Sequence, residues 1–142
     1  MIAASRGGKN TKVHAAVNKD VLPVALAFSD GKANDKTRMM ELVEKAKPSA
    51  GAKLLADRGY AYNSLHDALE ALGFNTCIPP RSNLKMQWFW DKDTYKRRNV
   101  VERFFCKLKQ YRSIATRYAK RIRHFKAIVF LASILIILKH KM

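Results

Sequence analysis

The segment Asp93–Arg112, DTYKRRNVVERFFCKLKQYR, carries four polar residues that would share one side of a helix. At about 100° per residue they fall within an arc of roughly 60°; they are Tyr95, Arg98, Glu102 and Lys109. Apolar residues fill the opposite side, namely Val100, Val101, Phe104, Phe105, Leu108 and Tyr111. The pattern predicts a helix with one buried face and a narrow face that holds a carboxylate between cations. Such a carboxylate suits a place where a metal ion and a phosphate backbone meet.

A second carboxylate, Asp57, ends the apolar run Lys53–Asp57, KLLAD, and is followed by Gly59. The run predicts a short buried strand, and open α/β sheets place functional residues at the carboxyl ends of their strands. A turn role before Gly59 explains Asp57 equally well, and an ion pair with Arg98 explains Glu102 equally well. Together the two acids suggest a site for Mg²⁺ or Mn²⁺, which take carboxylate and phosphate oxygens. Two such ions about 4 Å apart can activate the attacking oxygen and stabilise the leaving one in phosphodiester chemistry.

The charge of the chain indicates a polyanionic partner. Lys and Arg number 28 against 11 Asp and Glu, which gives a net charge of +17 over 142 residues. Nucleic acid is the first candidate and an anionic membrane the second. The plain alternative is a soluble basic protein without such a partner. The length fits one domain, and 48% hydrophobic residues argue against general disorder.

Cysteine and histidine do not form a pattern of ligands. Cys77 and Cys106 lie far apart without a C-x-x-C spacing, which argues against a disulfide framework or a zinc ribbon and suits a reducing cytoplasm. The four histidines, more simply explained as surface or strand residues, are His14, His66, His124 and His140.

A membrane anchor is a further alternative, resting on Ala127–Leu138, AIVFLASILIIL. As a helix these residues span about 18 Å, well short of the ~30 Å hydrocarbon core, so a buried core helix is favoured. Residues 1–10 are small and polar, and we expect no signal peptide.

The remaining pattern predicts an α/β layered domain that positions the two acids. A flexible basic entry at Ser5–Asn10 precedes a hairpin of strands Lys12–Val17 and Val21–Ser29, with Pro23 at the start or an edge. A helix capped by Asn34 or Asp35 follows and ends near Lys47. The later elements are a strand at Lys53–Asp57, a helix capped by Asn63 or Ser64 and closed by Gly73, a strand at Thr76–Ile78, a loop at Arg81–Lys92, the helix capped by Asp93 or Thr94, a break at Ser113–Thr116 and the apolar final helix.

The four polar residues also carry a family resemblance. Tyr95, Arg98, Glu102 and Lys109 match the spacing Y-x(2)-R-x(3)-E-x(6)-K of insertion-sequence DDE transposases, in the group related to the insertion sequence numbered five. The blocks LLADRGYAYNSL, IPPRSN and VERFFCKLKQYRSIATRYAK also resemble that family. The resemblance extends from about Ser5 to Leu138, so residues 1–142 are taken as a single domain with basic ends.

The resemblance implies a ribonuclease H-like fold, with a mixed sheet flanked by helices. It also implies metal-dependent nicking of transposon ends by water and joining of the freed 3′-hydroxyl to target DNA. Asp57 and Glu102 would be the second and third metal-binding acids, with Mg²⁺ or Mn²⁺ as the metal. The expected DNA-binding residues are Tyr95, Arg98, Lys109, Arg97, Arg103, Arg112 and Arg117. A homo-oligomer at the nucleoid of a bacterial cytoplasm, without membrane attachment, is the expected setting.

One departure from the family concerns its first aspartate, which lies on the strand before the one at Lys12–Val17. The sequence starts after that point, and Asp20 and Asp30 lie in the wrong blocks to replace it. We therefore expect a second-frame product or a fragment that lacks its first strand, completed by an upstream-frame product, inactive alone and poorly folded.

The competing hypothesis is a basic DNA-binding module without catalysis. It rests on the charge and on Trp88, Phe89 and Trp90 in the loop, where base stacking would contribute ~1–3 kcal/mol per base. Packing of the two tryptophans on the domain is the simpler explanation for that loop.

Overall fold

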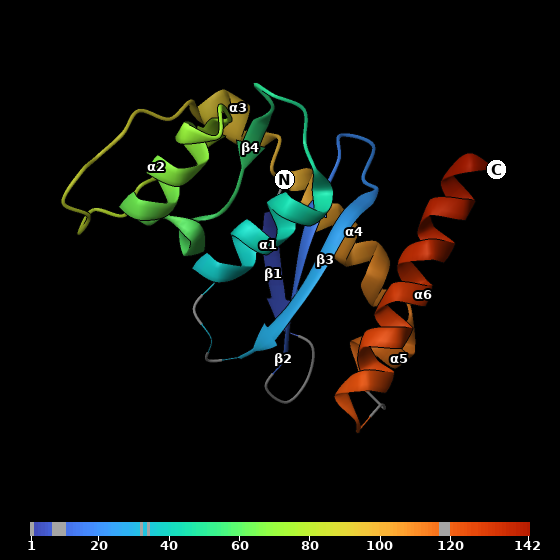
Figure 1. The fold of residues 1–142 in the computed structure, drawn as a ribbon. Coiled ribbons are helices and arrows are strands. Elements are labelled where there is room, and N and C mark those ends of the chain that lie inside the picture. The colour runs from blue at the N-terminus through green and yellow to red at the C-terminus, as the bar shows by residue number, and fades with distance from the viewer. Residues whose placement is uncertain (1, 7–10, 32, 34, 117–119) are drawn as a thin grey trace.

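The computed structural model describes residues 2–6, 11–31, 33, 35–116 and 120–142. Five strands and six α-helices follow one another with a short 3₁₀ helix, η1, between β4 and α2 (Figure 1). Their bounds are β1 Ile2–Arg6, β2 Thr11–Val17, β3 Pro23–Asp30, α1 Lys36–Ala46, β4 Lys53–Leu55, η1 Arg58–Tyr60, α2 Asn63–Ala71, β5 Asn75–Cys77, α3 Lys92–Lys96, α4 Asn99–Lys109, α5 Arg112–Ala115 and α6 Ile122–Lys141. The mixed α/β class expected from the sequence is confirmed.

An antiparallel sheet in the order β1-β2-β3 forms the centre of the molecule. The predicted hairpin is confirmed, with His14 opposite Ala27 and Val17 opposite Pro23, the first residue of β3. In the turn, the Asn18 side chain accepts hydrogen bonds from the backbone N–H groups of Asp20 and Leu22, both at 3.0 Å. This side chain stands in for a backbone acceptor and fixes the turn.

Strand β1 pairs with β2 from Ile2 opposite Ala16 to Arg6 opposite Lys12. We expected the chain to lack the strand that precedes Lys12–Val17. Because β1 lies beside β2, that expectation was wrong at this edge of the sheet. The expectation of a flexible entry was wrong for Ser5 and Arg6, which end β1, and residues 7–10 lie outside the described part. An antiparallel edge strand needs only backbone pairing, which the small residues of IAASR can supply. This stretch contains no acid.

Strands β4 and β5 form a second, parallel sheet, with Lys53 opposite Asn75 and Leu55 opposite Cys77. The described strands therefore make two small sheets, and the expected single mixed sheet was wrong. The β4–η1–α2–β5 segment is a parallel crossover unit, which pairs its own two strands. At three residues each, these strands offer few ladder hydrogen bonds for extending the sheet further.

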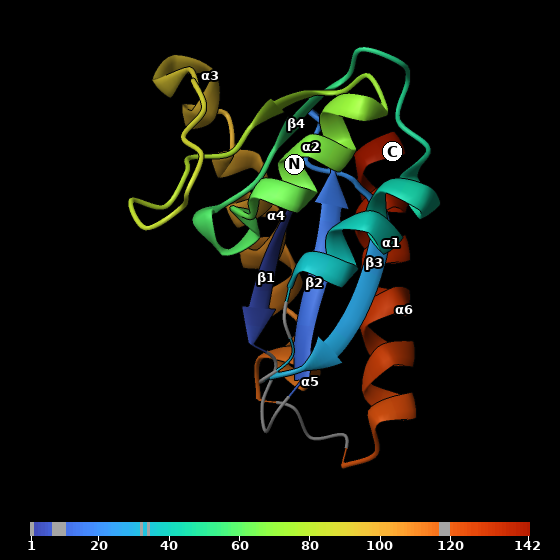
Figure 2. The ribbon, with the colours of Figure 1, turned by 60° about the vertical axis from the view of Figure 1, so that its left-hand side comes forward.

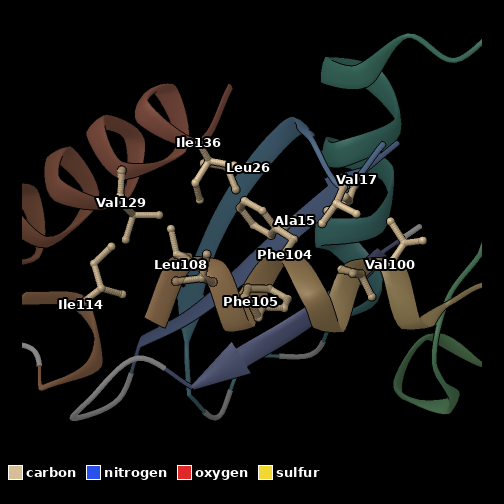
Figure 3. Close-up of a cluster of buried hydrophobic side chains, with 14 of the residues drawn as sticks. Ala15, Val17, Leu26, Val100, Phe104, Phe105, Leu108, Ile114, Val129 and Ile136 are labelled. Carbon is tan, nitrogen blue, oxygen red and sulfur yellow. The ribbon is translucent and has the colours of Figure 1, made fainter. Parts of the chain in front are cut away.

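Strand β2 is buried on both faces, so the molecule has two cores. Its residues Val13, Ala15 and Val17 join one core with α4 and α6, whereas Ala16 faces the other core with α1 and α2. Figure 2 shows α1 and α2 on one side of the antiparallel sheet and α4 and α6 on the other. In Figure 3 side chains from β2, β3, α4 and α6 converge in the first core. Burial of these apolar groups is the main stabilising contribution to the layered arrangement.

The predicted single helix from Asp93 is divided into α3 and α4, and that part of the prediction was wrong. The backbone N–H groups of Arg97 and Arg98 bond to Thr94 and Tyr95, three residues back, which tightens the chain between the two helices. Helix α3 has no buried residue, whereas α4 buries five. The tighter turn lets the apolar face of α4 pack on the sheet while polar α3 stays at the surface.

Helix starts also differ from the sequence prediction. Asp91 caps α3, because its carboxylate accepts hydrogen bonds from the N–H groups of Asp93 and Thr94 at 3.1 and 3.0 Å. The expected caps Asp93 and Thr94 therefore lie inside α3. Helix α2 follows Tyr62 without a side-chain cap, because the residues expected as caps, Asn63 and Ser64, are its first two residues. Gly73 has φ +82° and closes α2 as predicted.

The C-terminal region contains α5 where a break was expected, and a final helix longer than predicted. Helix α6 is buried along one face, including Phe125, Val129 and Ile136, and exposed along another that includes Leu131 and Ile134. The prediction of a core helix thus holds for one face. Within the described residues, no helix combines the length and apolar character needed to cross a bilayer.

Candidate active site

Asp57 follows β4 after one buried residue, Ala56, and starts the η1 turn. Its Oδ1 accepts a hydrogen bond from the Gly59 N–H at 2.7 Å, so the turn role considered from the sequence is real. No described residue donates a hydrogen bond to its Oδ2. Burial raises the pKa of Asp57, while the Gly59 hydrogen bond and the positive charge of Arg98 act to lower it. The carboxylate is thus half-buried, with one oxygen left for a ligand.

Gly59 allows a second carboxylate to come near Asp57. A Cβ at position 59 would lie 2.7 Å from Asp57 Oδ1 and 3.5 Å from Asp35 Oδ2. At the first distance an added side chain would displace the Asp57 carboxylate, so Gly59 preserves the position of that carboxylate. Asp35 makes no side-chain cap hydrogen bond to α1 and instead pairs with Lys12, Nζ to Oδ1 at 3.0 Å. Sequence reasoning, which gave Asp35 only a capping role, missed this proximity.

His14 supports the same turn from the sheet. It is fully buried, and its Nδ1 lies 2.7 Å from the Tyr60 hydroxyl and its Nε2 2.7 Å from Ser29 Oγ. Ser29 donates to the Asp30 carbonyl at 3.3 Å. Ser29 therefore accepts from Nε2–H, and Nδ1 accepts from the Tyr60 O–H. Burial lowers the pKa of His14 to about 4 and raises that of Tyr60, so both groups are uncharged near neutral pH.

Arg81 holds the outer side of the η1 turn. Its Nε donates to the Arg58 carbonyl at 2.9 Å and its Nη2 to the Gly59 carbonyl at 3.1 Å. The guanidinium lies over the Tyr62 ring, 5.0 Å from the centroid. The resemblance pointed to Arg81 only as part of IPPRSN, and its contacts with the turn 22 residues earlier could not be read from the sequence.

Glu102 lies in the first turn of α4 and accepts a charge-assisted hydrogen bond from Arg98 Nη2. The ion pair considered from the sequence is therefore present. The Glu102 side chain is 56% exposed, and Arg98 lies over the Tyr95 ring, 5.6 Å from its centroid. The positive charge of Arg98 also opposes the burial that raises the pKa of Asp57. Arg98 therefore interacts with Glu102, Tyr95 and Asp57.

The other expected DNA-binding residues are spread over the surface. Lys109 ends α4 and is exposed, about 10 Å along the helix axis from Glu102 at 1.5 Å per residue. Arg97, Arg103 and Arg112 are also exposed, whereas Arg117 lies outside the described residues. Among the residues that the structure describes, no three His, Cys, Asp or Glu side chains gather closely enough to hold a metal ion.

A family model and a relative identified by sequence both point to one family. Residues 3–137 match the model of the transposase DDE domain. A candidate transposase for insertion sequence element IS6501 of Brucella ovis is 31% identical over 134 residues, which cover 91% of this chain and 98% of that protein. The zinc-bound crystal structure of the large terminase nuclease from thermophilic phage G20c is 17% identical and covers 93% of this chain and 77% of the other. Its TM-score of 0.37 is too low to establish a shared fold.

Proposed function

The chain belongs to the family of insertion-sequence DDE transposases, and from this premise we propose that it takes part in metal-dependent DNA cleavage and strand transfer. The observation that carries the proposal is the placement of Arg98, which pairs with Glu102 and whose positive charge opposes the burial that raises the pKa of Asp57. An acid that follows a strand, an acid on a later helix and a cation that interacts with both would suit a metal ion and a phosphate. A ribonuclease H-like fold is part of this proposal.

The donor set fits a hard divalent cation. Asp57 has an oxygen without a hydrogen bond from the described residues, and Glu102 is largely open to solvent. Mg²⁺ typically uses one or two protein carboxylates and completes its coordination with phosphate oxygens and water. Mg²⁺ or Mn²⁺ bound here would activate a water or 3′-hydroxyl oxygen and stabilise the leaving oxygen.

The side chains around the acids have separable roles. If Glu102 leaves Arg98 to bind the metal ion, the Arg98 guanidinium can neutralise a DNA phosphate. The face of the Tyr95 ring supports that guanidinium. The η1 turn keeps Asp57 in place through Gly59, Arg81 and the Tyr60–His14 hydrogen bond. The exposed cations that would bind the backbone of transposon ends and target DNA are Lys109, Arg97, Arg103 and Arg112, with Arg117 proposed from the sequence alone.

A third carboxylate comes, in this proposal, from a partner chain, such as an upstream-frame transposase product. The residues of β1 include no acid. Asp35 is the other acid near Gly59 besides Asp57, but it already pairs with Lys12. The isolated chain is then inactive, and the working form is a homo-oligomer on DNA in the bacterial cytoplasm and nucleoid.

A cleavage assay tests the proposal with DNA carrying the ends of the element. The chain fused to the segment encoded upstream should cut and join this DNA with Mg²⁺ or Mn²⁺, and the chain alone should not. Asp57→Asn and Glu102→Gln should each abolish cleavage by the fusion. Glu44→Gln, at an exposed acid on α1, is the matched control and should cleave normally. Cleavage that survives Glu102→Gln, or cleavage by the chain alone, would contradict the proposal.

A DNA-binding module without catalysis is the second candidate. It is favoured by the +17 charge and by the occupied Arg98–Glu102 ion pair. In that case Glu102→Gln frees a cation, improves DNA binding and removes no activity.

A further inference from the structure

Phe89 is presented to solvent by a loop whose other aromatic residues are anchored. Its residue surface is 90% exposed, more than that of any other large hydrophobic residue in the described part except the terminal Met142. Single exposed apolar residues are common on protein surfaces and need no special role. Phe89 differs from such residues in two ways. Its neighbours in the loop are fixed by hydrogen bonds and ring contacts, and charged residues surround it in the sequence.

The residues on each side of Phe89 are tied to the end of β5. The Trp88 indole N–H donates to the Ile78 carbonyl at 2.7 Å, and its ring stacks on His66 with centroids 4.3 Å apart. On the other side, the Cys77 thiol donates to the Asp91 carbonyl at 3.4 Å. The tryptophan packing expected as the simpler explanation is therefore correct for Trp88, and Phe89 is left as the outward residue.

The loop as a whole is also fixed at its base. The Asn63 side chain donates to the Met86 carbonyl at 2.8 Å, and the Gln87 amide donates to the Arg81 carbonyl at 2.8 Å. Figure 1 shows this segment between β5 and α3 passing outside α2. A platform that is already ordered loses little entropy when it binds a ligand.

The contacts of the loop continue into the candidate active site. The Trp90 ring meets the Tyr95 ring edge-on, with centroids 5.4 Å apart, and Tyr95 lies under Arg98, the partner of Glu102. Residues 81–97 include five cations and two acids. The exposed ring thus lies at the positively charged border of the site, where a phosphate backbone would pass.

We propose that Phe89 stacks on an unpaired nucleobase of the DNA strand that lies at Arg98 and Glu102. This inference rests on the proposed function, since it requires DNA at the candidate active site. Every base offers a π face, so the contact needs no particular sequence. Cleavage creates a strand end with a free 3′-hydroxyl and joining uses that end. Bases at such an end unpair most readily, and the ring would hold one of them.

Binding of two DNA probes in EDTA tests the proposal. One is a fully paired duplex, and the other is the same duplex with a three-nucleotide overhang that carries 2-aminopurine. The full-length protein should quench the 2-aminopurine fluorescence. Phe89→Ala should lose the quenching and bind the overhang probe about fivefold or more weakly, whereas Phe89→Trp should retain both. Met86→Ala, at a second exposed apolar residue of the loop, is the matched control and should behave as the unmodified protein.

The outcomes separate the two proposals. If the unmodified protein binds neither probe, the proposed function fails and this inference fails with it. If it binds both probes and Phe89→Ala quenches and binds as before, only the stacking is overturned. A change of oligomeric state in Phe89→Ala without DNA, together with unaltered quenching, would assign Phe89 to a protein contact and also overturn the inference. All variants should give the same paired-duplex affinity and the same circular dichroism spectrum as the unmodified protein.

Discussion

At the scale of single residues, the η1 turn depends on a buried chain of hydrogen bonds in one fixed direction. Tyr60 donates to His14, and His14 donates to Ser29. This arrangement requires a neutral imidazole, since a protonated His14 would have no acceptor for the Tyr60 hydroxyl. The charged neighbours act in both directions: Asp35 and Glu41 raise the pKa of His14, and Lys12 and Arg38 lower it, but burial dominates.

The direction of the His14 shift predicts how stability changes with pH. The pKa is about 4 in the folded protein, against 6.5 for a free histidine, so the unfolded chain binds the proton first as the pH falls. The contribution of neutral His14 to the free energy of unfolding is complete above pH 6.5 and is lost progressively towards pH 4. The loss between pH 7 and pH 5 is about 2 kcal/mol. Urea unfolding at pH 7 and pH 5 measures this change in the free energy of unfolding.

Two variants separate His14 from other titrating groups. His14→Gln should show a smaller loss of unfolding free energy between pH 7 and 5 than the unmodified protein. His124→Gln, at an exposed histidine of α6, should show the same loss as the unmodified protein. Equal pH dependence in all three proteins would mean that His14 is not a buried neutral group.

At the scale of elements, α4 connects the chemistry with the core. Its solvent face carries Glu102 and Lys109, and its opposite face packs Phe104, fully buried, against the sheet and α6. The direction of Glu102 therefore depends on how the apolar side of α4 is packed. The short α3 carries Tyr95 and follows the anchored loop, and it buries no residue in the core.

Truncation of Phe104 should show how strongly this packing stabilises α4. Phe104→Ala removes a buried ring and leaves a cavity, and it should lower the free energy of unfolding by about 3–5 kcal/mol. Arg103→Ala, at the neighbouring exposed position, should change it by no more than about 0.5 kcal/mol. Guanidinium unfolding followed by circular dichroism measures both. A loss below about 1 kcal/mol for Phe104→Ala would show that α4 does not rest on this core.

Local patterns predicted those parts of the molecule that depend on neighbouring residues. The β2–β3 hairpin, the apolar face of α4 and the place of Asp57 after a buried strand all follow from periodicity and turn residues. The His14–Tyr60 contact spans 46 residues, and the Arg81 contacts with the η1 turn span 22 and 23 residues. Such pairs, the division of the strands into two sheets and the tightening at Arg97 and Arg98 are set by tertiary packing, which a single sequence does not report.

At the scale of the whole molecule, the described residues form two cores on opposite sides of one antiparallel sheet. The sheet joins the core that carries Glu102, through α4, to the core that carries Asp57, through β4 and η1. In the proposed function, the net charge of +17 would draw DNA to the molecule without selecting a sequence. The two acids would then distinguish a metal-dependent enzyme from a basic binding module on the same scaffold.

Mn²⁺ binding in the presence of duplex DNA, followed by the electron paramagnetic resonance signal of free Mn²⁺, tests this central claim most directly. The unmodified chain should bind Mn²⁺, and Asp57→Asn and Glu102→Gln should each weaken the binding at least about tenfold, the least expected when a group of the metal site is lost. Glu44→Gln should bind as the unmodified chain does. Equal Mn²⁺ affinity in all four proteins would contradict the account, because Asp57 and Glu102 would then have no part in holding a metal.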